Sequence, residues 1–145
     1  MYRVLDVAQY IIRRCHSQGR SISNLKLQKI LYFVQAQYLV ATGNKCFREE
    51  IEAWDFGPVV PEAYHYYKAY GSANIPTFRR LGENKEIISE EDRMIIDEII
   101  DECSQRSASA LVQITHNQAP WKDNYVPGWN NTIPAPEIKK YFEEE

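Results

Sequence analysis

Three histidines, His16, His65 and His116, are the residues best suited to metal binding or acid–base catalysis. They form neither an HxxxH nor an HExxH pair, and no Cys or Asp stands nearby at the spacing typical of a zinc site. His116 lies at a predicted helix end, where an imidazole can bond the last carbonyls, so a structural cap is the favoured interpretation. The sequence therefore predicts neither a metal nor a cofactor.

Nucleophilic catalysis would require a Ser, Cys or Thr beside a positioned base. Cys15 and His16 are adjacent in sequence, which on a helix points their side chains about 100° apart. The acidic residues of segment 49–55 could supply an acid/base couple, but a charge cluster beside a turn is usually a solvated surface. There is no glycine-rich phosphate loop. We therefore predict a protein that is not an enzyme, and a hydrolase using His116 or His65 stays open as the less favoured alternative.

DNA recognition is a second class of function to weigh. The first two predicted helices, joined by QGRSIS, follow the order of a helix-turn-helix, whose second helix reads DNA. A recognition helix needs polar side chains on an exposed face, whereas ILYFVQAQYLV is mostly occupied with burial. The net charge of −3 also disfavours a binder of the phosphate backbone, so nucleic acid is not an expected partner. A DNA-binding transcriptional regulator remains an alternative that would need a basic face from Arg13, Arg14, Lys26 and Lys29.

Large rings crowd one segment, EAWDFGPVVPEAYHYYKAYG at residues 52–71. On a helix over its second half, the tyrosines would spread over more than the one face that a core can cover, so some should be exposed. The glycine and prolines fix the bend, and preorganised rings reduce the entropic cost of association. The alternative is that the tyrosines cover the core while their hydroxyls touch water. The predicted partner-binding surface consists of Trp54, Phe56, Tyr64, Tyr66, Tyr67 and Tyr70.

A central helix is expected over residues 24–42. Ser23 can cap its start and Gly43 stands where a helix normally ends. Apolar residues occupy almost its whole circumference. Its remaining polar side chains are expected on a narrow strip left for water, and they are Lys26, Gln28, Lys29, Gln35 and Gln37.

The rest of the chain predicts a mostly α, compact single-domain fold, residues 1–145, around that central helix, with a minor β-hairpin or small sheet. The sheet is expected around residues 50–56 and 76–88, and residues 123–136 are expected to be loop because they are rich in Pro, Gly and Asn. Further helices are expected at residues 4–19, 61–70, 89–105, 107–116 and 136–144.

The composition and the N-terminal segment indicate the cellular compartment to expect. The start lacks a cationic segment followed by an apolar stretch, and no apolar run approaches the roughly 18 residues of a membrane span, so we expect a cytoplasmic protein. Three cysteines, Cys15, Cys46 and Cys103, are odd in number and have no CxxC spacing. They are expected to be buried as small apolar residues.

Three motifs carry a family resemblance. NLKLQKILYFVQAQYLVATG, then F-x-E-x-IEAWDFGPVVPEAYHYYKAYG, then THNQAPW resemble the Panacea domain family, also described as SocA-like or phage-associated GepA-like proteins. The resemblance spans nearly the whole chain, with the motifs in family order. The family's characteristic residues fall on Asn24, Leu25, Leu27, Gln28, Lys29, Leu31 and Tyr32, on Glu52, Ala53, Trp54, Gly57, Pro58, Val59 and Tyr64, and on His116, Pro120 and Trp121.

The resemblance implies a bacterial antitoxin domain, commonly encoded beside a toxin gene in prophages and mobile elements, which neutralises its toxin through protein–protein contact. It implies no enzymatic activity. An acidic rim around the aromatic surface would favour a basic toxin. A cellular protease would be a second partner if neutralisation works by handing over the toxin. The tail after Trp121 is richer in Trp, Pro and Asn than the family pattern, and one hypothesis places toxin choice there.

Overall fold

The computed structural model describes residues 1–77 and 86–144. The described chain is mostly helical with a small antiparallel sheet, as predicted. The predicted strand region at residues 76–88 lies largely outside the described residues. In chain order the elements are α1 (Val4–Ser17), α2 (Asn24–Thr42), β1 (Ile51–Trp54), β2 (Gly57–Val59), α3 (Pro61–Tyr67), the 3₁₀ turn η1 (Lys68–Tyr70), α4 (Glu90–Ser104), α5 (Ala108–His116), α6 (Ala119–Lys122), β3 (Asn131–Ile133) and α7 (Ala135–Glu143).

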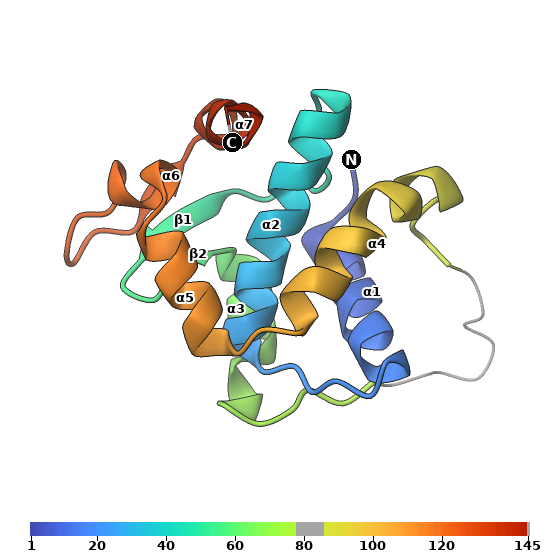
Figure 1. The fold of residues 1–145 in the computed structure, drawn as a ribbon. Helices are drawn as coiled ribbons and strands as arrows, with labels where there is room; N and C mark the ends of the chain where they lie inside the picture. Colours follow the sequence, from blue (N-terminus) through green and yellow to red (C-terminus); the bar gives the residue numbers. More distant parts are fainter. Residues whose placement is uncertain (78–85, 145) are drawn as a thin grey trace.

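The central position predicted for α2 is confirmed. The helix runs through the middle of the molecule, with α1 and α4 on one side and α5 and the sheet on the other (Figure 1). Its start is capped by Ser23, whose side chain accepts a hydrogen bond from the Lys26 amide, and it ends at Gly43 in the left-handed region. Apolar residues on several sides of α2 are buried, including Leu27, Tyr32 and Ala36.

The prediction of a solvated polar strip on α2 is wrong for Gln28, Lys29 and Gln35, which are buried. Their partners are backbone groups of the segments that wrap around the helix. The Oε1 atom of Gln35 accepts from the amides of Cys46 and Phe47, and its Nε2 donates to the Phe47 carbonyl. Each side chain thus replaces water with a partner in the chain, which a buried polar group requires.

Buried polar side chains of α2 also bind the start of α3. The Oε1 atom of Gln28 accepts from the Val60 amide at 3.0 Å, and its Nε2 donates to Oδ1 of Asn24 at 2.9 Å. Asn24 in turn donates to the Tyr64 carbonyl at 3.0 Å. The Nζ atom of Lys29 donates to the Pro58 carbonyl at 2.9 Å, so α2 fixes the chain from Pro58 to Tyr64.

The sheet has the strand order β2–β1–β3, and all pairs are antiparallel. Strands β1 and β2 form a tight hairpin in which Trp54 pairs with Gly57, which leaves Asp55 and Phe56 as the turn. Strand β3 lies in residues 123–136, so the prediction that this segment is entirely loop is wrong. Its three residues acquire strand structure by pairing with β1, which is some 80 residues away in sequence, and their own sequence carries no strand period.

One hydrophobic core connects residues from Val4 to Ile138. The three cysteines are buried and free, as predicted. Among the described residues, no helix has both the length and the hydrophobicity that crossing a bilayer demands.

The burial of Lys29 leads to a prediction about how the stability of the protein depends on pH. Burial lowers its pKa to about 7, against an ordinary value of 10.5. Between these two values the unfolded chain holds a proton that the folded chain does not, so the free energy of unfolding rises as the pH rises. From pH 7 to 8.5 the wild type should gain about 1.5 kcal/mol relative to Lys29→Met. Urea denaturation at both pH values measures this difference.

Ionisation of cysteines and tyrosines affects the wild type and the variant alike, so it cancels in that comparison. Lys68→Met makes the same chemical change at an exposed position and should follow the wild-type profile. Parallel profiles for wild type and Lys29→Met would show that Lys29 is charged in the folded protein.

The hairpin leaves no space for a side chain at Gly57, which leads to a prediction about stability. Its φ is +102°, and a Cβ there would lie 2.7 Å from Cε of Lys29 and 2.8 Å from Oγ1 of Thr115. Gly57→Ala should therefore lower the free energy of unfolding by roughly 2–4 kcal/mol. Gly19→Ala is the control, because Gly19 also has a positive φ but open space around it, and it should lose about 1 kcal/mol. Equal losses in urea denaturation would contradict the steric argument.

Candidate functional site

The turn between β1 and β2 is held by side chains from other helices. Three carbonyl oxygens, one in the turn and two in the strands that flank it, each accept a hydrogen bond from a side chain that lies far away in sequence. The pairs are Trp121 Nε1 to Trp54 O at 2.8 Å, His116 Nε2 to Asp55 O at 3.0 Å and Lys29 Nζ to Pro58 O at 2.9 Å. The backbone of the turn is therefore fixed along its length.

His116 does not cap its own helix, so that prediction is wrong. Its Nε2–H donates to the Asp55 carbonyl in the β1–β2 turn. The imidazole also stacks on the indole of Trp121, with ring centroids 4.0 Å apart and an angle of 19° between the planes. The packing of α5 and α6 beside the turn offers the ring a carbonyl of another element, and sequence neighbours could not indicate that.

Tyr125 extends this stack and reaches the same turn. Its ring lies 4.5 Å from that of Trp121 at an angle of 18°, and its hydroxyl donates to the Asp55 carboxylate. The hydrogen bond to Asp55 raises the pKa of Tyr125. Sequence analysis missed Tyr125, for which the one available signal is its position four residues after Trp121.

The predicted aromatic surface divides into exposed and buried rings. Phe56 at the tip of the turn is 53% exposed and Tyr66 on α3 is 59% exposed. Trp54, Tyr64 and Tyr70 are half-buried.

Tyr67 is only 5% exposed and belongs to the core, so it offers no surface to a partner. The buried residues of α3 are Ala63 and Tyr67, which are four positions apart and lie on one side of the helix. Burial raises the pKa of Tyr67 to about 12. The prediction that all four tyrosines contribute to a surface therefore has to be corrected at this position.

The half-buried rings of Trp54 and Tyr64 connect β1 to α3 along one edge of the molecule. The ring of Trp54 lies 5.0 Å from that of Tyr64 and 6.1 Å from that of His65. Trp54 also donates its indole N–H to Oε1 of Glu52 at 2.9 Å. In the part of the chain that the structure describes, His65 makes no hydrogen bond or ion pair with a carboxylate, so its geometry gives no support to the hydrolase alternative.

Most of the predicted signature residues lie inside the protein and support this edge. Leu27, Leu31, Tyr32, Ala53 and Val59 are in the core or next to it, Leu25 is partly buried and Pro120 is buried. The polar signature residues Asn24, Gln28, Lys29, His116 and Trp121 hold the backbone of the turn or of α3. The signature thus describes how the turn is supported more than what it exposes.

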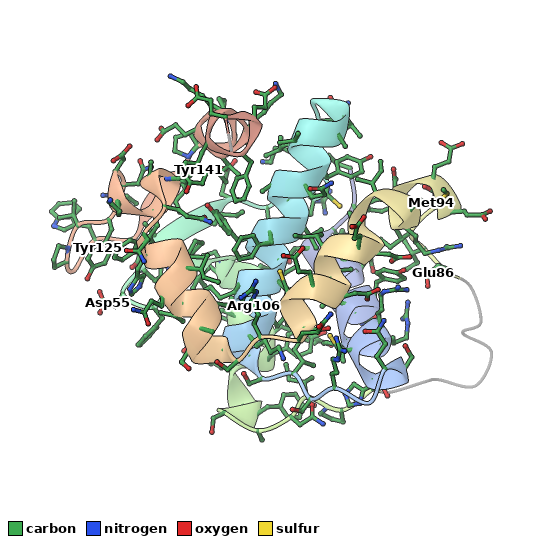
Figure 2. All side chains as sticks on the ribbon, viewed as in Figure 1. Asp55, Glu86, Met94, Arg106, Tyr125 and Tyr141 are labelled. Carbon is green, nitrogen blue, oxygen red and sulfur yellow. The ribbon has the colours of Figure 1, made fainter. Side chains whose placement is uncertain are left out.

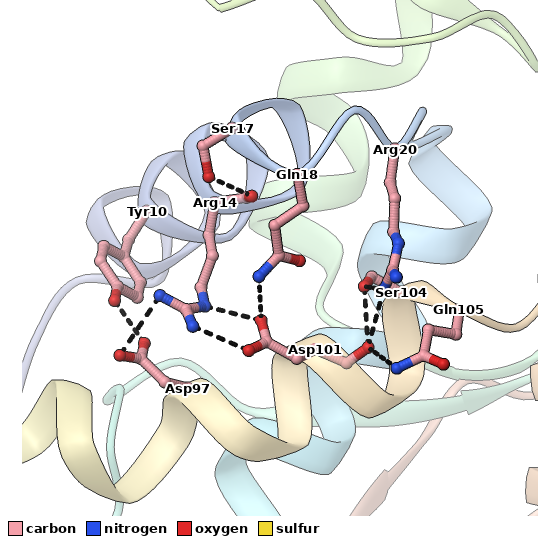
Figure 3. A network of polar contacts seen from close by, with 9 residues as sticks. All are labelled: Tyr10, Arg14, Ser17, Gln18, Arg20, Asp97, Asp101, Ser104 and Gln105. Atoms are coloured by element: carbon pink, nitrogen blue, oxygen red, sulfur yellow. Dashed lines mark hydrogen bonds and ion pairs between the residues drawn. The ribbon is translucent and has the colours of Figure 1, made fainter.

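The basic face required by the DNA-binding alternative is not formed. Arg14 makes two hydrogen bonds of 2.7 Å to the carboxylate of Asp101, which ties α1 to α4 (Figure 3). This guanidinium lowers the pKa of Asp101. The other three predicted cations are also engaged: Arg13 with Glu86, Lys26 with the Ser104 carbonyl, and Lys29 in the core. Moreover, α2 is too buried to read DNA.

A surface hollow and the placement of possible metal ligands also bear on whether the protein could catalyse a reaction. A polar hollow of about 250 Å³ lies beside the starts of α2 and α5 and is lined mainly by serines, with Lys26 and Asn74. Among the residues with described positions, no histidine or carboxylate lines it. Over residues 1–77 and 86–144, no three His, Cys, Asp or Glu side chains converge in a way that could hold a metal ion.

Comparisons with known proteins agree with the resemblance seen in the motifs. The family model described as "Antitoxin SocA-like, Panacea domain" matches residues 27–122. The chain is similar to "Antitoxin SocA" of Caulobacter vibrioides (strain NA1000 / CB15N), with 33% identity over 127 residues. That similarity covers 79% of this chain and 66% of the length of the relative. No solved structure matches the chain.

The matched segment contains the β1–β2 turn, α3 and the side chains of Lys29, His116 and Trp121 that hold the turn. The chain belongs to the antitoxin SocA-like Panacea domain family.

Proposed function

We propose that this chain acts as a single antitoxin domain in the bacterial cytoplasm, and that it neutralises a protein toxin by binding it directly, without catalysing a reaction. Family membership supports the antitoxin role. The single observation that carries the binding mode is the exposed Phe56 on a turn that three other side chains hold through carbonyl oxygens of the turn and its flanking strands.

The physical reason is preorganisation. A flexible loop loses conformational entropy when it binds, whereas this turn is already fixed, so binding has to order little more than side-chain rotamers. Aromatic residues bury a large area for few rotatable bonds and are enriched among the residues that dominate protein interfaces. The docking surface on this edge consists of Trp54, Phe56, Tyr64, Tyr66 and Tyr70.

The charges around this edge favour a basic partner. Asp55 in the turn and Glu62 on α3 are exposed, Glu50 before β1 is paired with Lys45, and the whole chain carries a net charge of −3. Acidic groups at the rim of an apolar surface speed the encounter with a positively charged protein and disfavour acidic ones. A toxin with a basic rim around an apolar recess would complement this edge.

The aromatic edge gives the first test of the proposal. Phe56→Ala/Tyr66→Ala should weaken binding to the toxin by about 30-fold, which corresponds to about 2 kcal/mol. Because both rings are more than half exposed, the variant should keep its thermal stability. The toxin is identified as the product of the adjacent gene if its expression arrests growth and this chain restores growth. Calorimetric titration of that toxin with wild type and variant gives the affinities.

Met94→Ala is the matched control, because Met94 is 76% exposed and lies on the opposite side of the molecule from Asp55 and Tyr125 (Figure 2). It should bind like the wild type. Unchanged affinity of the double variant would place the docking surface elsewhere. The half-life of the toxin, with and without this chain in the cell, separates steric blocking from delivery to a cellular protease.

A further inference from the structure

A second exposed apolar pair lies on the loop that joins α6 to β3. Trp129 is 67% exposed and Val126 is 45% exposed. This loop forms the far left edge of the molecule and projects away from α1 and α4 (Figure 1). Trp129 contacts no other ring, and its indole N–H has no hydrogen-bond partner among the residues that the structure describes. An indole left this open is unusual, because tryptophan is highly buried on average.

The loop presents this pair in a fixed geometry. Val126 and Trp129 face each other as an antiparallel bridge pair, and the Trp129 amide donates to the Val126 carbonyl at 3.0 Å. Between them stand Pro127 and Gly128, and Gly128 has a φ of +81°. Proline followed by a glycine of positive φ is the sequence of a type II turn, so the residues match the backbone they adopt.

Hydrogen bonds of two asparagines close the loop at its base. Asn131 donates to the Asn124 carbonyl at 3.0 Å. The side-chain amide of Asn124 donates to the Pro120 carbonyl at 2.8 Å and to Oε1 of Glu137 at 3.0 Å. The loop is therefore tied to both α6 and α7, although it exposes its apolar residues.

The loop and the β1–β2 turn belong to one edge of the molecule. Tyr125, next to Val126, donates its hydroxyl to Asp55, which is next to Phe56. Asn131, two residues after Trp129, pairs with Ala53 in the sheet. The match to the family model ends at residue 122, so Phe56 lies within the matched segment and Trp129 lies beyond it.

We propose that the Val126–Trp129 turn is the part of the docking surface that selects this antitoxin's own toxin, with Trp129 inserted into an apolar recess of that toxin. This inference rests on the proposed function. Asp55 and Glu137 bind the base of the loop through Tyr125 and Asn124, and Asp123 at the start of the loop is exposed next to a single cation, Lys122. The recess that fits this acidic surrounding has a basic rim. The Phe56 turn supplies affinity in the segment shared with the family, and the Trp129 turn supplies selectivity.

The test compares toxins as well as variants. Trp129→Ala and Phe56→Ala/Tyr66→Ala are titrated with the growth-arresting product of the adjacent gene and with the corresponding toxin of another family member that the wild type binds weakly. Trp129→Ala should lose about 30-fold in affinity for its own toxin and less than threefold for the other toxin. The double variant should lose affinity for both. Thermal denaturation checks that each variant folds, and Met94→Ala is again the control.

The outcomes separate the two proposals. If Trp129→Ala binds its own toxin like the wild type while the double variant binds weakly, the selectivity inference fails and the proposed function stands. If the wild type binds no toxin at all, the proposed function itself fails. If Trp129→Ala changes only the mass of the free protein in light scattering, the occupant of this surface is a second copy of the chain and the inference is overturned. Trp129→Phe should recover part of the lost affinity, because a ring again fills the recess.

Discussion

The structure depends on the rule that a polar group taken out of water needs a partner inside the protein. Helix α2 is surrounded on most sides, yet it carries Asn24, Gln28, Lys29 and Gln35 in buried positions. Leaving a buried donor or acceptor unpaired costs about 1–3 kcal/mol, so each of these side chains has to bind a nearby backbone group. Over the described residues, every buried side-chain nitrogen and oxygen has a hydrogen-bond partner, either a backbone group or another side chain. The loops around α2 are consequently fixed by the helix that they cover.

This constraint connects the core to the surface. Lys29 lies in the interior, but the carbonyl it binds belongs to Pro58, two residues after the exposed Phe56. On the other side of the turn, the rings of His116, Trp121 and Tyr125 stack and direct their polar atoms at Trp54 and Asp55. An exposed aromatic residue on a mobile loop would lose much of its binding energy to ordering. Here the ordering is already supplied by contacts made during folding.

The network between α1 and α4 has a different role. Arg14 bonds Asp101 and Asp97, while Tyr10 bonds Asp97 and Gln18 bonds Asp101 (Figure 3). These contacts neutralise much of the inner acidic face of α4 and hold two helices together far from the aromatic edge. They also engage Arg14, one of the four cations that the DNA-binding alternative would require.

Local sequence determined the features that depend on neighbouring residues. The caps at Ser23, Ser89 and Ser107, the end of α2 at Gly43 and the start of α3 at Pro61 all follow from interactions within a few positions. The apolar periodicity identified α2 as the central helix, and the motifs identified the family.

Tertiary structure decided what depends on residues distant in sequence. Strand β3 exists because β1 pairs with it, Tyr67 is buried because α3 turns that side to the core, and Gln28 and Lys29 are buried because other segments cover them. The same is true of His116, whose partner is a carbonyl 61 residues away. The period of the apolar residues shows which face of a helix is turned to the core. It does not show where a polar side chain finds its hydrogen-bond partner, which can be water or a distant backbone group. Only the arrangement of the whole chain determines which of the two it meets.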